Sequence, residues 1–270
     1  MSTPLLVRDW EKDVVYLVQM PRAGAIPSIS PFCLKLETWL RIAEVPYHNI
    51  SNDFTHLSYK GQIPFVELNG RQIADTNYII SEIGRIFNIN LDKFLSEIEW
   101  ANAIAYQVMI ENSLLWGIYY FQSINNNFLA TTDGIINHFV GVKRFIFKTF
   151  TLGQKRRNMA AKCKAMGIGR DTSSEVENAF KKQLNSLSIF LGNKKFLMGD
   201  HATTVDAVMF AVLANYYYLP LSKTLKNFIE EKENLMDYVR RMREEYWSDW
   251  HDATSKLSLQ TKPKPKERER

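Results

Sequence analysis

Apolar and polar residues follow two different rhythms along this chain, and the change falls near residue 90. A short apolar run at 14–20, rich in β-branched and aromatic residues, ends at Pro21 and predicts a buried strand. Apolar residues at helical spacing then predict a helix over 31–44, and residues 45–50 predict a second short strand. The first part of the chain therefore alternates strand and helix.

A hairpin is the clearest local signal in the chain. Two β-like runs at 61–68 and 71–74 flank Asn69-Gly70, a pair typical of a type I′ turn because both central residues take positive φ. Either Asp75 or Thr76 can cap the helix that follows. That helix carries an apolar stripe made of Tyr78, Ile79, Ile80, Ile83 and Ile86.

From about residue 92 onward the pattern is helical, without comparable strand signals. The predicted helices are 95–122, 135–150, 174–191, 204–218 and 224–246. We expect an α/β domain over 10–88, an all-helical domain over 92–250 and a basic disordered tail over 256–270.

Composition narrows the class of protein. Hydrophobic residues make up 46% and charged residues 23% of 270 residues, which indicates a globular chain. Three of the five net positive charges fall within 261–270, so nucleic acid is not an expected partner. The longest apolar run, 208–221, is too short and too interrupted for a membrane span, and no leader is apparent. We therefore expect a cytoplasmic protein.

Candidate chemistry gathers where the first strand passes into the first helix. Ser30 is a suitable N-cap, Pro31 suits the first helical position, and Cys33 lies on the first turn. A hydroxyl and a thiol at a helix N-terminus lie in a positive field, which favours a thiolate or another small anion. The only other cysteine is Cys163, so neither a disulfide framework nor a metal site is expected.

Four motifs in this order resemble the glutathione transferases, which join a thioredoxin-like α/β domain to an all-α domain. They are Ser-Pro-Phe-Cys at 30–33, Gln-Ile-Pro at 62–64, Ala-Asp-Thr-Asn at 74–77, and Gly199 to Asp206 with Thr203 as N-cap. Residues 28–41, 60–70 and 166–170 are further similar to the failed-axon-connections proteins. That branch also includes the cadmium-responsive proteins and, more distantly, the metaxins.

The resemblance implies a glutathione site in the first domain. Ser30, with Ser28 as a competitor, would donate a hydrogen bond to the glutathione sulfur and hold it as thiolate. Pro64 would be cis, leaving the backbone of Ile63, next to Gln62, to pair with an extended peptide. For Ser30, the alternative is a plain N-cap.

Charged residues near this site have two interpretations as well. Asp75 would hold an α-amino group and Thr76 an α-carboxylate, although helix capping explains both. Arg22, Lys35 and Lys60 are candidates for the glycyl carboxylate, or ordinary surface charges.

The helical domain offers two further features. Trp116 and Tyr120 either line an apolar pocket for a hydrophobic co-substrate or belong to the core. A basic cluster around a glycine-containing loop either is a solvated face or meets an acidic membrane or protein partner. Its members are Lys143, Arg144, Lys148, Lys155, Arg156, Arg157, Lys162 and Lys164.

Two functions of different classes follow. The first is a glutathione transferase-like protein that binds glutathione or a related thiol peptide, as substrate or ligand, and conjugates it to an apolar electrophile. The second is a non-catalytic scaffold with a role in axon development or at an organelle surface. The resemblance also admits a homodimer, and fold alone does not choose between the two functions.

Overall fold

The structure is a computed structural model that describes residues 4–263, and within them the chain forms two compact units. The sheet unit comprises residues 4–23, 27–90 and 242–263, and the helical unit comprises 24–26 and 91–241. The expected two-domain architecture, thioredoxin-like followed by all-helical, is confirmed. The difference is that residues 242–250, which the sequence assigned to the helical domain, pack with the sheet.

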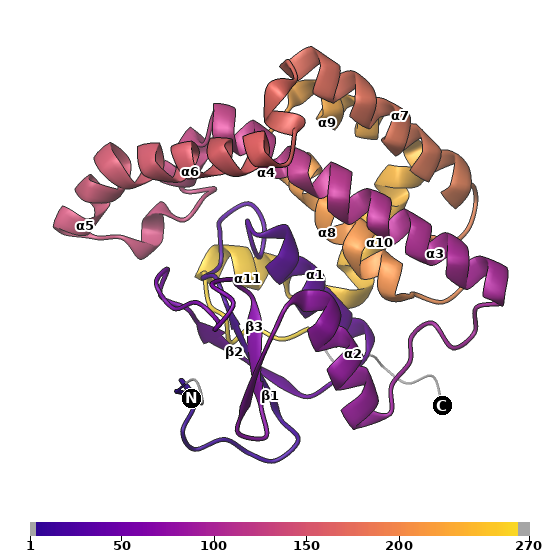
Figure 1. Cartoon of the computed structure of the whole chain (residues 1–270), viewed down its shortest axis with the longest axis horizontal. Coiled ribbons are helices and arrows are strands. Elements are labelled where there is room, and N and C mark those ends of the chain that lie inside the picture. Colours follow the sequence, from indigo (N-terminus) through magenta and orange to yellow (C-terminus); the bar gives the residue numbers. More distant parts are fainter. Residues whose placement is uncertain (1–3, 264–270) are drawn as a thin grey trace. The chain divides into compact units, whose positions relative to one another are not determined.

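A four-stranded mixed sheet forms the centre of the sheet unit (Figure 1). Its strands are β1 (Val15–Gln19), β2 (Tyr47–Ser51), β3 (Phe65–Leu68) and β4 (Arg71–Ala74). The spatial order is β2-β1-β3-β4, with β1 parallel to β2 and antiparallel to β3. Every residue of β1 is buried, as expected for a central strand covered on both faces.

Two helices connect and flank these strands. Helix α1 (Pro31–Ile42) makes the crossover that the parallel pair requires, and Ser30 caps it. Asn69 and Gly70 both have positive φ, 50° and 75°, so the predicted Asn-Gly turn is confirmed. Helix α2 (Thr76–Phe87) starts directly after β4 with Asp75 as its N-cap.

The helical unit is built from helices, and several of them begin with a capping side chain. Its main helices are α3 (Glu97–Met109), η1 (Ile110–Leu114, a π-helical turn), α4 (Leu115–Ile124), α7 (Ser173–Leu191), α8 (Thr204–Tyr218) and α9 (Lys223–Glu230). The predicted capping box of α8 is present, because the Asp206 carboxylate accepts hydrogen bonds from the backbone N–H and hydroxyl of Thr203, at 2.8 and 2.7 Å. Nearly all of α8 is buried, so it forms the core of this unit.

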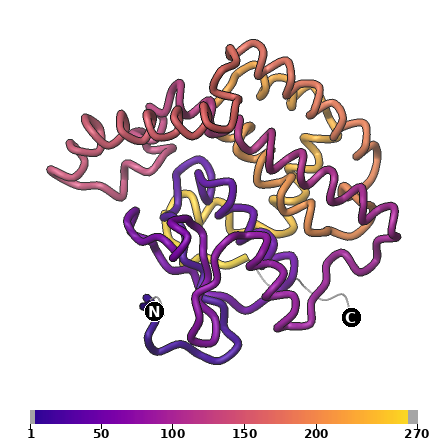
Figure 2. The backbone as a smooth tube through the Cα atoms, viewed as in Figure 1, coloured from indigo at the N-terminus to yellow at the C-terminus, as the bar shows by residue number. Residues whose placement is uncertain are grey.

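One helical segment is longer than the sequence predicted. After the short turns η2 (Asn127–Ala130) and η3 (Ile136–His138), the chain coils without a break through α5 (Gly141–Ile146), the π-helical turn η4 (Phe147–Thr151) and α6 (Leu152–Ala165). Figure 2 shows this stretch as one continuous coil. The basic cluster therefore lies on a helix, and not around the expected glycine-containing loop.

The end of the chain also differs from expectation. The predicted helix 224–246 is two helices, α9 and α10 (Glu233–Tyr246), and α11 (Trp250–Lys256) follows. The sequence assigned 256–270 to a disordered tail, but Leu259 is buried and its carbonyl accepts a hydrogen bond from Asn49 of β2 at 2.9 Å. Residues 264–270 lie outside the described part of the chain.

Candidate thiol-peptide site

The predicted binding residues meet at one end of the sheet. Strands β3 and β4 are antiparallel with Phe65 opposite Ala74, so Pro64 comes opposite Asp75. The Ile63–Pro64 bond is cis, as the resemblance implied. Within residues 4–263, neither the N–H nor the C=O of Ile63 forms a backbone hydrogen bond. Ile63 therefore offers a peptide-like edge directly beside the start of α2.

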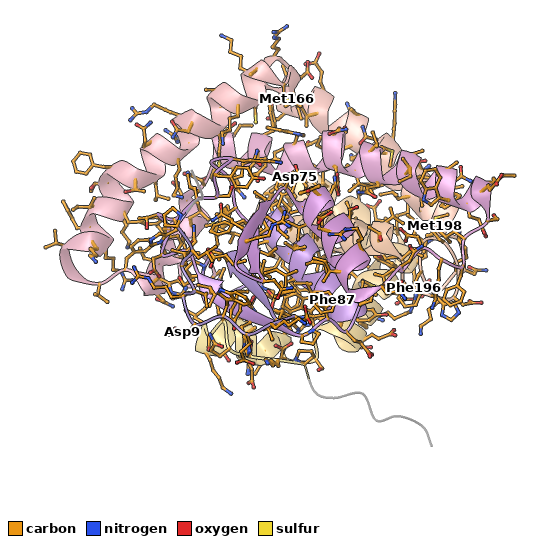
Figure 3. All side chains as sticks on the ribbon, turned by 60° about the horizontal axis from the view of Figure 1, so that its bottom comes forward. Asp9, Asp75, Phe87, Met166, Phe196 and Met198 are labelled. Carbon is orange, nitrogen blue, oxygen red and sulfur yellow. The ribbon has the colours of Figure 1, made fainter. Side chains whose placement is uncertain are left out.

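Asp75 has an unusual backbone for a residue with a side chain. Its φ is 85° and its ψ is 121°, a region that non-glycine residues rarely adopt and that costs about 1–3 kcal/mol. The carboxylate accepts hydrogen bonds from the N–H groups of Asn77 and Tyr78, at 3.1 and 3.2 Å, yet the residue is exposed. Figure 3 shows Asp75 at the start of α2, at the opposite end of that helix from Phe87. The carboxylate that caps α2 therefore belongs to a residue that is exposed at the surface.

Lys35 brings a positive charge to the same place. Its ammonium nitrogen lies 3.0 Å from the hydroxyl oxygen of Thr76 and 2.6 Å from the side-chain oxygen of Asn77. The side chain is 1% exposed, so this is not the surface charge that was the alternative interpretation of Lys35. Because the first turn of α2 already carries a partial positive charge, ammonium and helix together favour a carboxylate there.

The two candidate serines surround the protein's own thiol. Ser30 accepts a hydrogen bond from the Cys33 N–H at 3.4 Å, which is the N-cap interaction, and the Ser28 hydroxyl accepts one from the Ser30 N–H at 3.3 Å. Burial raises the pKa of Cys33, and hydrogen bonds with Ser30, Met20 and Ser28 only partly oppose this. Ser28 is fully buried and Ser30 is 8% exposed. The geometry gives Ser30 its capping role and gives Ser28 no access to solvent.

The other candidate binding residues, Gln62, Lys60 and Arg22, differ in how accessible they are to a ligand. Gln62 exchanges hydrogen bonds with Ser58 through its backbone, and its side chain is exposed. The Lys60 ammonium lies 5.7 Å from the centre of the Tyr78 ring, close to the first turn of α2. Arg22 is fully buried in an ion pair with Glu37, so it is not available to a ligand carboxylate.

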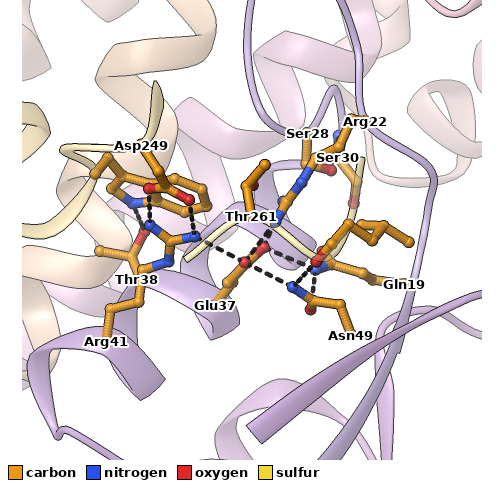
Figure 4. Close-up of polar contacts among 12 residues, drawn as sticks. Gln19, Arg22, Ser28, Ser30, Glu37, Thr38, Arg41, Asn49, Asp249 and Thr261 are labelled. Carbon is orange, nitrogen blue, oxygen red and sulfur yellow. Dashed lines mark hydrogen bonds and ion pairs between the residues drawn. The ribbon is translucent and has the colours of Figure 1, made fainter. Parts of the chain in front are cut away.

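The Glu37 network is the feature that the sequence interpretation missed. The Glu37 carboxylate accepts hydrogen bonds from five side chains at 2.6–3.2 Å (Figure 4). The donors are Gln19, Arg22, Arg41, Tyr47 and Asn49. Glu37 and Arg41, at i and i+4 within a mostly apolar helix, were the signal for it.

This network also connects the C-terminal segment to α1 of the sheet unit. The Arg41 guanidinium donates to Asp249 at 2.6 Å and lies 3.6 Å from the centre of the Trp247 ring, while the Trp247 indole donates to Thr38 at 3.0 Å. Burial alone would raise the pKa of Glu37, but the Arg22 and Arg41 guanidiniums hold it well below its usual range. The network is therefore ionised and structural.

Trp116 and Tyr120, in the helical unit, are not equivalent. Trp116 lines a small pocket of about 220 Å³ together with Met166, Val176 and Phe180. Tyr120 is buried and its hydroxyl donates to the carbonyl of Asp171 at 2.9 Å. Trp116 alone of the two borders the pocket.

No group of three or more His, Cys, Asp or Glu side chains in residues 4–263 is arranged to hold a metal ion. Over the same residues, the helices are either too short or too polar to cross a bilayer. Burial raises the pKa of Cys163 to about 11, so its basic neighbours do not make it a reactive thiolate.

Comparison with protein families agrees with the fold. The glutathione S-transferase N-terminal domain family matches residues 31–128, and the glutathione S-transferase C-terminal domain family matches residues 180–242. Among solved structures, a beta-etherase from Sphingobium covers 87% of this chain and 99% of its own, with 13% identity and a TM-score of 0.57. A glutathione S-transferase from Methylobacterium radiotolerans, in complex with glutathione sulfonate, covers 87% and 93% at 13% identity with a TM-score of 0.51.

Similar protein sequences indicate which branch of this superfamily the chain belongs to. Failed axon connections from Drosophila melanogaster is 37% identical over 97% of this chain, and the chain spans 65% of that relative. The isoprene-epoxide glutathione S-transferase of a Rhodococcus strain is 28% identical over 83% of this chain and 95% of its own length. Mouse metaxin-2 is 23% identical over 89% and 91%. The chain belongs to the glutathione S-transferase superfamily, in the branch that contains failed axon connections and the metaxins.

Proposed function

We propose that the sheet unit binds glutathione or a related γ-glutamyl thiol peptide beside cis-Pro64. The observation that carries this proposal is the register of β3 and β4, which puts Ile63 and Pro64 next to Asp75 and Thr76. An extended peptide would pair with the backbone of Ile63, as a strand added to a sheet edge does. Solved structures of the same fold, including one in complex with glutathione sulfonate, support this choice of ligand.

The charges at the start of α2 match the two ends of a γ-glutamyl group. The exposed Asp75 carboxylate would hold the α-amino group. The Thr76 hydroxyl, with the Lys35 ammonium 3.0 Å away, would hold the α-carboxylate. A cytoplasmic location, where glutathione is kept reduced, is part of the same proposal.

Calorimetric titration with reduced glutathione tests this binding. Asp75→Asn is the sharpest variant, because Asn caps a helix as well as Asp and tolerates positive φ, but lacks the charge for the amino group. We expect Asp75→Asn and Lys35→Met to weaken binding at least about tenfold. Arg85→Met, on the far turn of the same helix, is the matched control and should bind normally. Equal affinity in Asp75→Asn and the unchanged protein would refute the proposed site.

Conjugation extends the proposal, and the 28% identical isoprene-epoxide transferase favours it. The glutathione sulfur would attack one carbon of an apolar epoxide, the carbon–oxygen bond would break, and the oxygen would take up the proton released by the thiol. Incubation with isoprene epoxide and glutathione, followed by detection of the conjugate, tests this step. Ser30→Ala should abolish turnover if Ser30 holds the thiolate, and should leave it unchanged if Ser30 is only the N-cap.

A non-catalytic interaction protein is the second candidate function. The placement of Ser28 and Ser30 around the buried Cys33 thiol favours it, since both hydroxyls then have structural partners. Its partners would be a protein, an acidic membrane surface or a second copy of the chain. Glutathione binding without conjugate formation, together with a defined partner, is the result expected for this candidate.

A further inference from the structure

The continuous helix 141–165 has an apolar stripe on its solvent side. Val142, Phe145, Ile146 and Phe150 follow one another at i, i+3, i+4 and i+8, which places them on one helix face. Their exposed fractions are 74%, 64%, 46% and 68%, and Val140 just before the helix is 75% exposed. Large apolar side chains gathered this way normally mark a surface that contacts another body.

The same helix is anchored to its own unit by a different face. Phe147 is 2% exposed and stacks on Phe139, with ring centres 4.4 Å apart, and Leu152 and Cys163 are also buried. In Figure 1, α6 runs along α4 while α5 continues beyond it. Helix 141–165 therefore uses its buried face for folding and leaves the apolar stripe unused.

Charge around the stripe has a single sign. Between residues 134 and 170 there are nine lysines and arginines and no aspartate or glutamate. Lys143 and Lys148 are exposed and flank the stripe, Arg144 is exposed on another side of the helix, and Arg156 and Arg157 continue the basic surface along it. Among the described residues, none of these five side chains forms a salt bridge.

Exposed apolar side chains on α3 provide a comparison, because the charges on that helix differ. On α3, Ile98, Trp100, Ile104 and Val108 are at least 41% exposed. That helix carries Glu97 and Glu99 in its first turn and no basic residue in its last. Of these two groups of exposed apolar side chains, the one on helix 141–165 has the basic border.

We propose that helix 141–165 binds the surface of an anionic phospholipid bilayer, with Val142, Phe145, Ile146 and Phe150 inserted among the acyl chains. Lys143 and Lys148, on the two flanks of the stripe, would contact the lipid phosphates. A helix that lies in the plane of a membrane has this division between apolar and basic faces. The proposal names the partner in the second candidate function and is independent of glutathione binding.

Vesicle co-sedimentation of the full chain tests the proposal. We expect binding to phosphatidylcholine vesicles that contain about 30 mol% phosphatidylserine, and little to phosphatidylcholine alone. Raising salt from about 0.1 M to about 0.5 M should weaken the binding, because exposed charges are then screened. No sedimentation with the anionic vesicles would overturn the proposal.

Two double variants separate insertion from charge. Phe145→Ser with Phe150→Ser should lower the partition coefficient at least about tenfold, because two exposed aromatic side chains no longer leave water on binding. Lys143→Gln with Lys148→Gln should lower it by a similar factor. Ile98→Ser with Val108→Ser on α3 is the matched control and should bind as the unchanged protein does.

Fluorescence quenching of an introduced tryptophan tests whether the stripe inserts into the bilayer. Phe145→Trp should be quenched by brominated acyl chains in the anionic vesicles, and Ile189→Trp, at a 73% exposed position on α7, should not. Quenching equal at both positions, or binding that depends on the lysines but not on the phenylalanines, would overturn insertion. The latter result would indicate an acidic protein partner. Glutathione titration of the same variants should give unchanged affinity, so failure of this proposal is distinguishable from failure of the thiol-peptide site.

Discussion

The sheet unit buries charged side chains that usually remain in water, whereas the helical unit exposes apolar side chains that usually remain inside. Arg22, Lys35 and Glu37 are at most 1% exposed in the first. Val142 and Phe145 are more than 60% exposed in the second. Both arrangements oppose the ordinary sorting of residues, so each requires a physical reason.

The buried charges are tolerated because Arg22 and Glu37 form an ion pair and Lys35 donates hydrogen bonds to Thr76 and Asn77. Glu37 receives two hydrogen bonds from Arg22 and one each from Arg41, Gln19, Tyr47 and Asn49. Such a group destabilises the fold mainly when one partner is removed, because the others remain buried without compensation. The exposed apolar side chains face solvent instead, so burial imposes no such constraint on them. The difference separates groups that hold the fold from groups that are free to contact a partner.

Glu37→Gln should have the largest effect on stability, and it tests whether the buried charges hold the fold. The variant leaves Arg22 and Arg41 buried without the shared carboxylate, and we expect a loss of about 3–5 kcal/mol in the free energy of unfolding. Urea denaturation followed by circular dichroism measures it. Glu82→Gln removes the exposed partner of Arg85 and is the control, with an expected change of less than about 1 kcal/mol. A small effect of Glu37→Gln would mean that the network is not structural.

Acid should reveal the same carboxylate in the unchanged protein. The pKa of Glu37 is lower in the folded chain than the ordinary value of 4.5, so its contribution to stability is complete above that value and is lost as pH falls toward the folded pKa. A single such group gives a slope of at most about 1.4 kcal/mol per pH unit.

Denaturation midpoints measured between pH 3 and pH 6, roughly the range in which carboxylates titrate, test this slope. The double variant Arg22→Met with Glu37→Gln lacks the carboxylate and one buried cation, and its slope should be smaller. If both proteins lose stability equally with falling pH, other carboxylates account for the acid sensitivity.

Local signals allowed most of the sheet unit to be predicted from sequence. The Asn-Gly turn and a cap at Asp75 or Thr76 depend on a few neighbouring residues, so they could be predicted, and the family resemblance implied the cis form of Pro64. The pairing of Pro64 with Asp75 then follows from the hairpin alone.

Long-range contacts account for what the sequence did not reveal. Lys35 reaches Thr76 across 41 residues, and Arg41 reaches Asp249 across 208. No periodicity carries that information. Helix 152–165 was missed for a different reason: most of its side chains are polar, and only Leu152 and Cys163 are buried, so it shows little apolar periodicity. The polar pattern was itself a consequence of the exposed basic surface.

Phe145→Ser should have the smallest effect on stability, and it tests whether the exposed apolar side chains of the helical unit contribute to the fold. Because the Phe145 side chain contacts mostly solvent, we expect the free energy of unfolding to change by less than about 0.5 kcal/mol. Phe147→Ser, two residues away on the buried face, should lose many times more, since its ring stacks on Phe139. Thermal and urea unfolding of both variants measure the contrast. If Phe145→Ser destabilises the protein as much as Phe147→Ser does, the apolar stripe is part of the fold, and its exposure no longer argues for a partner.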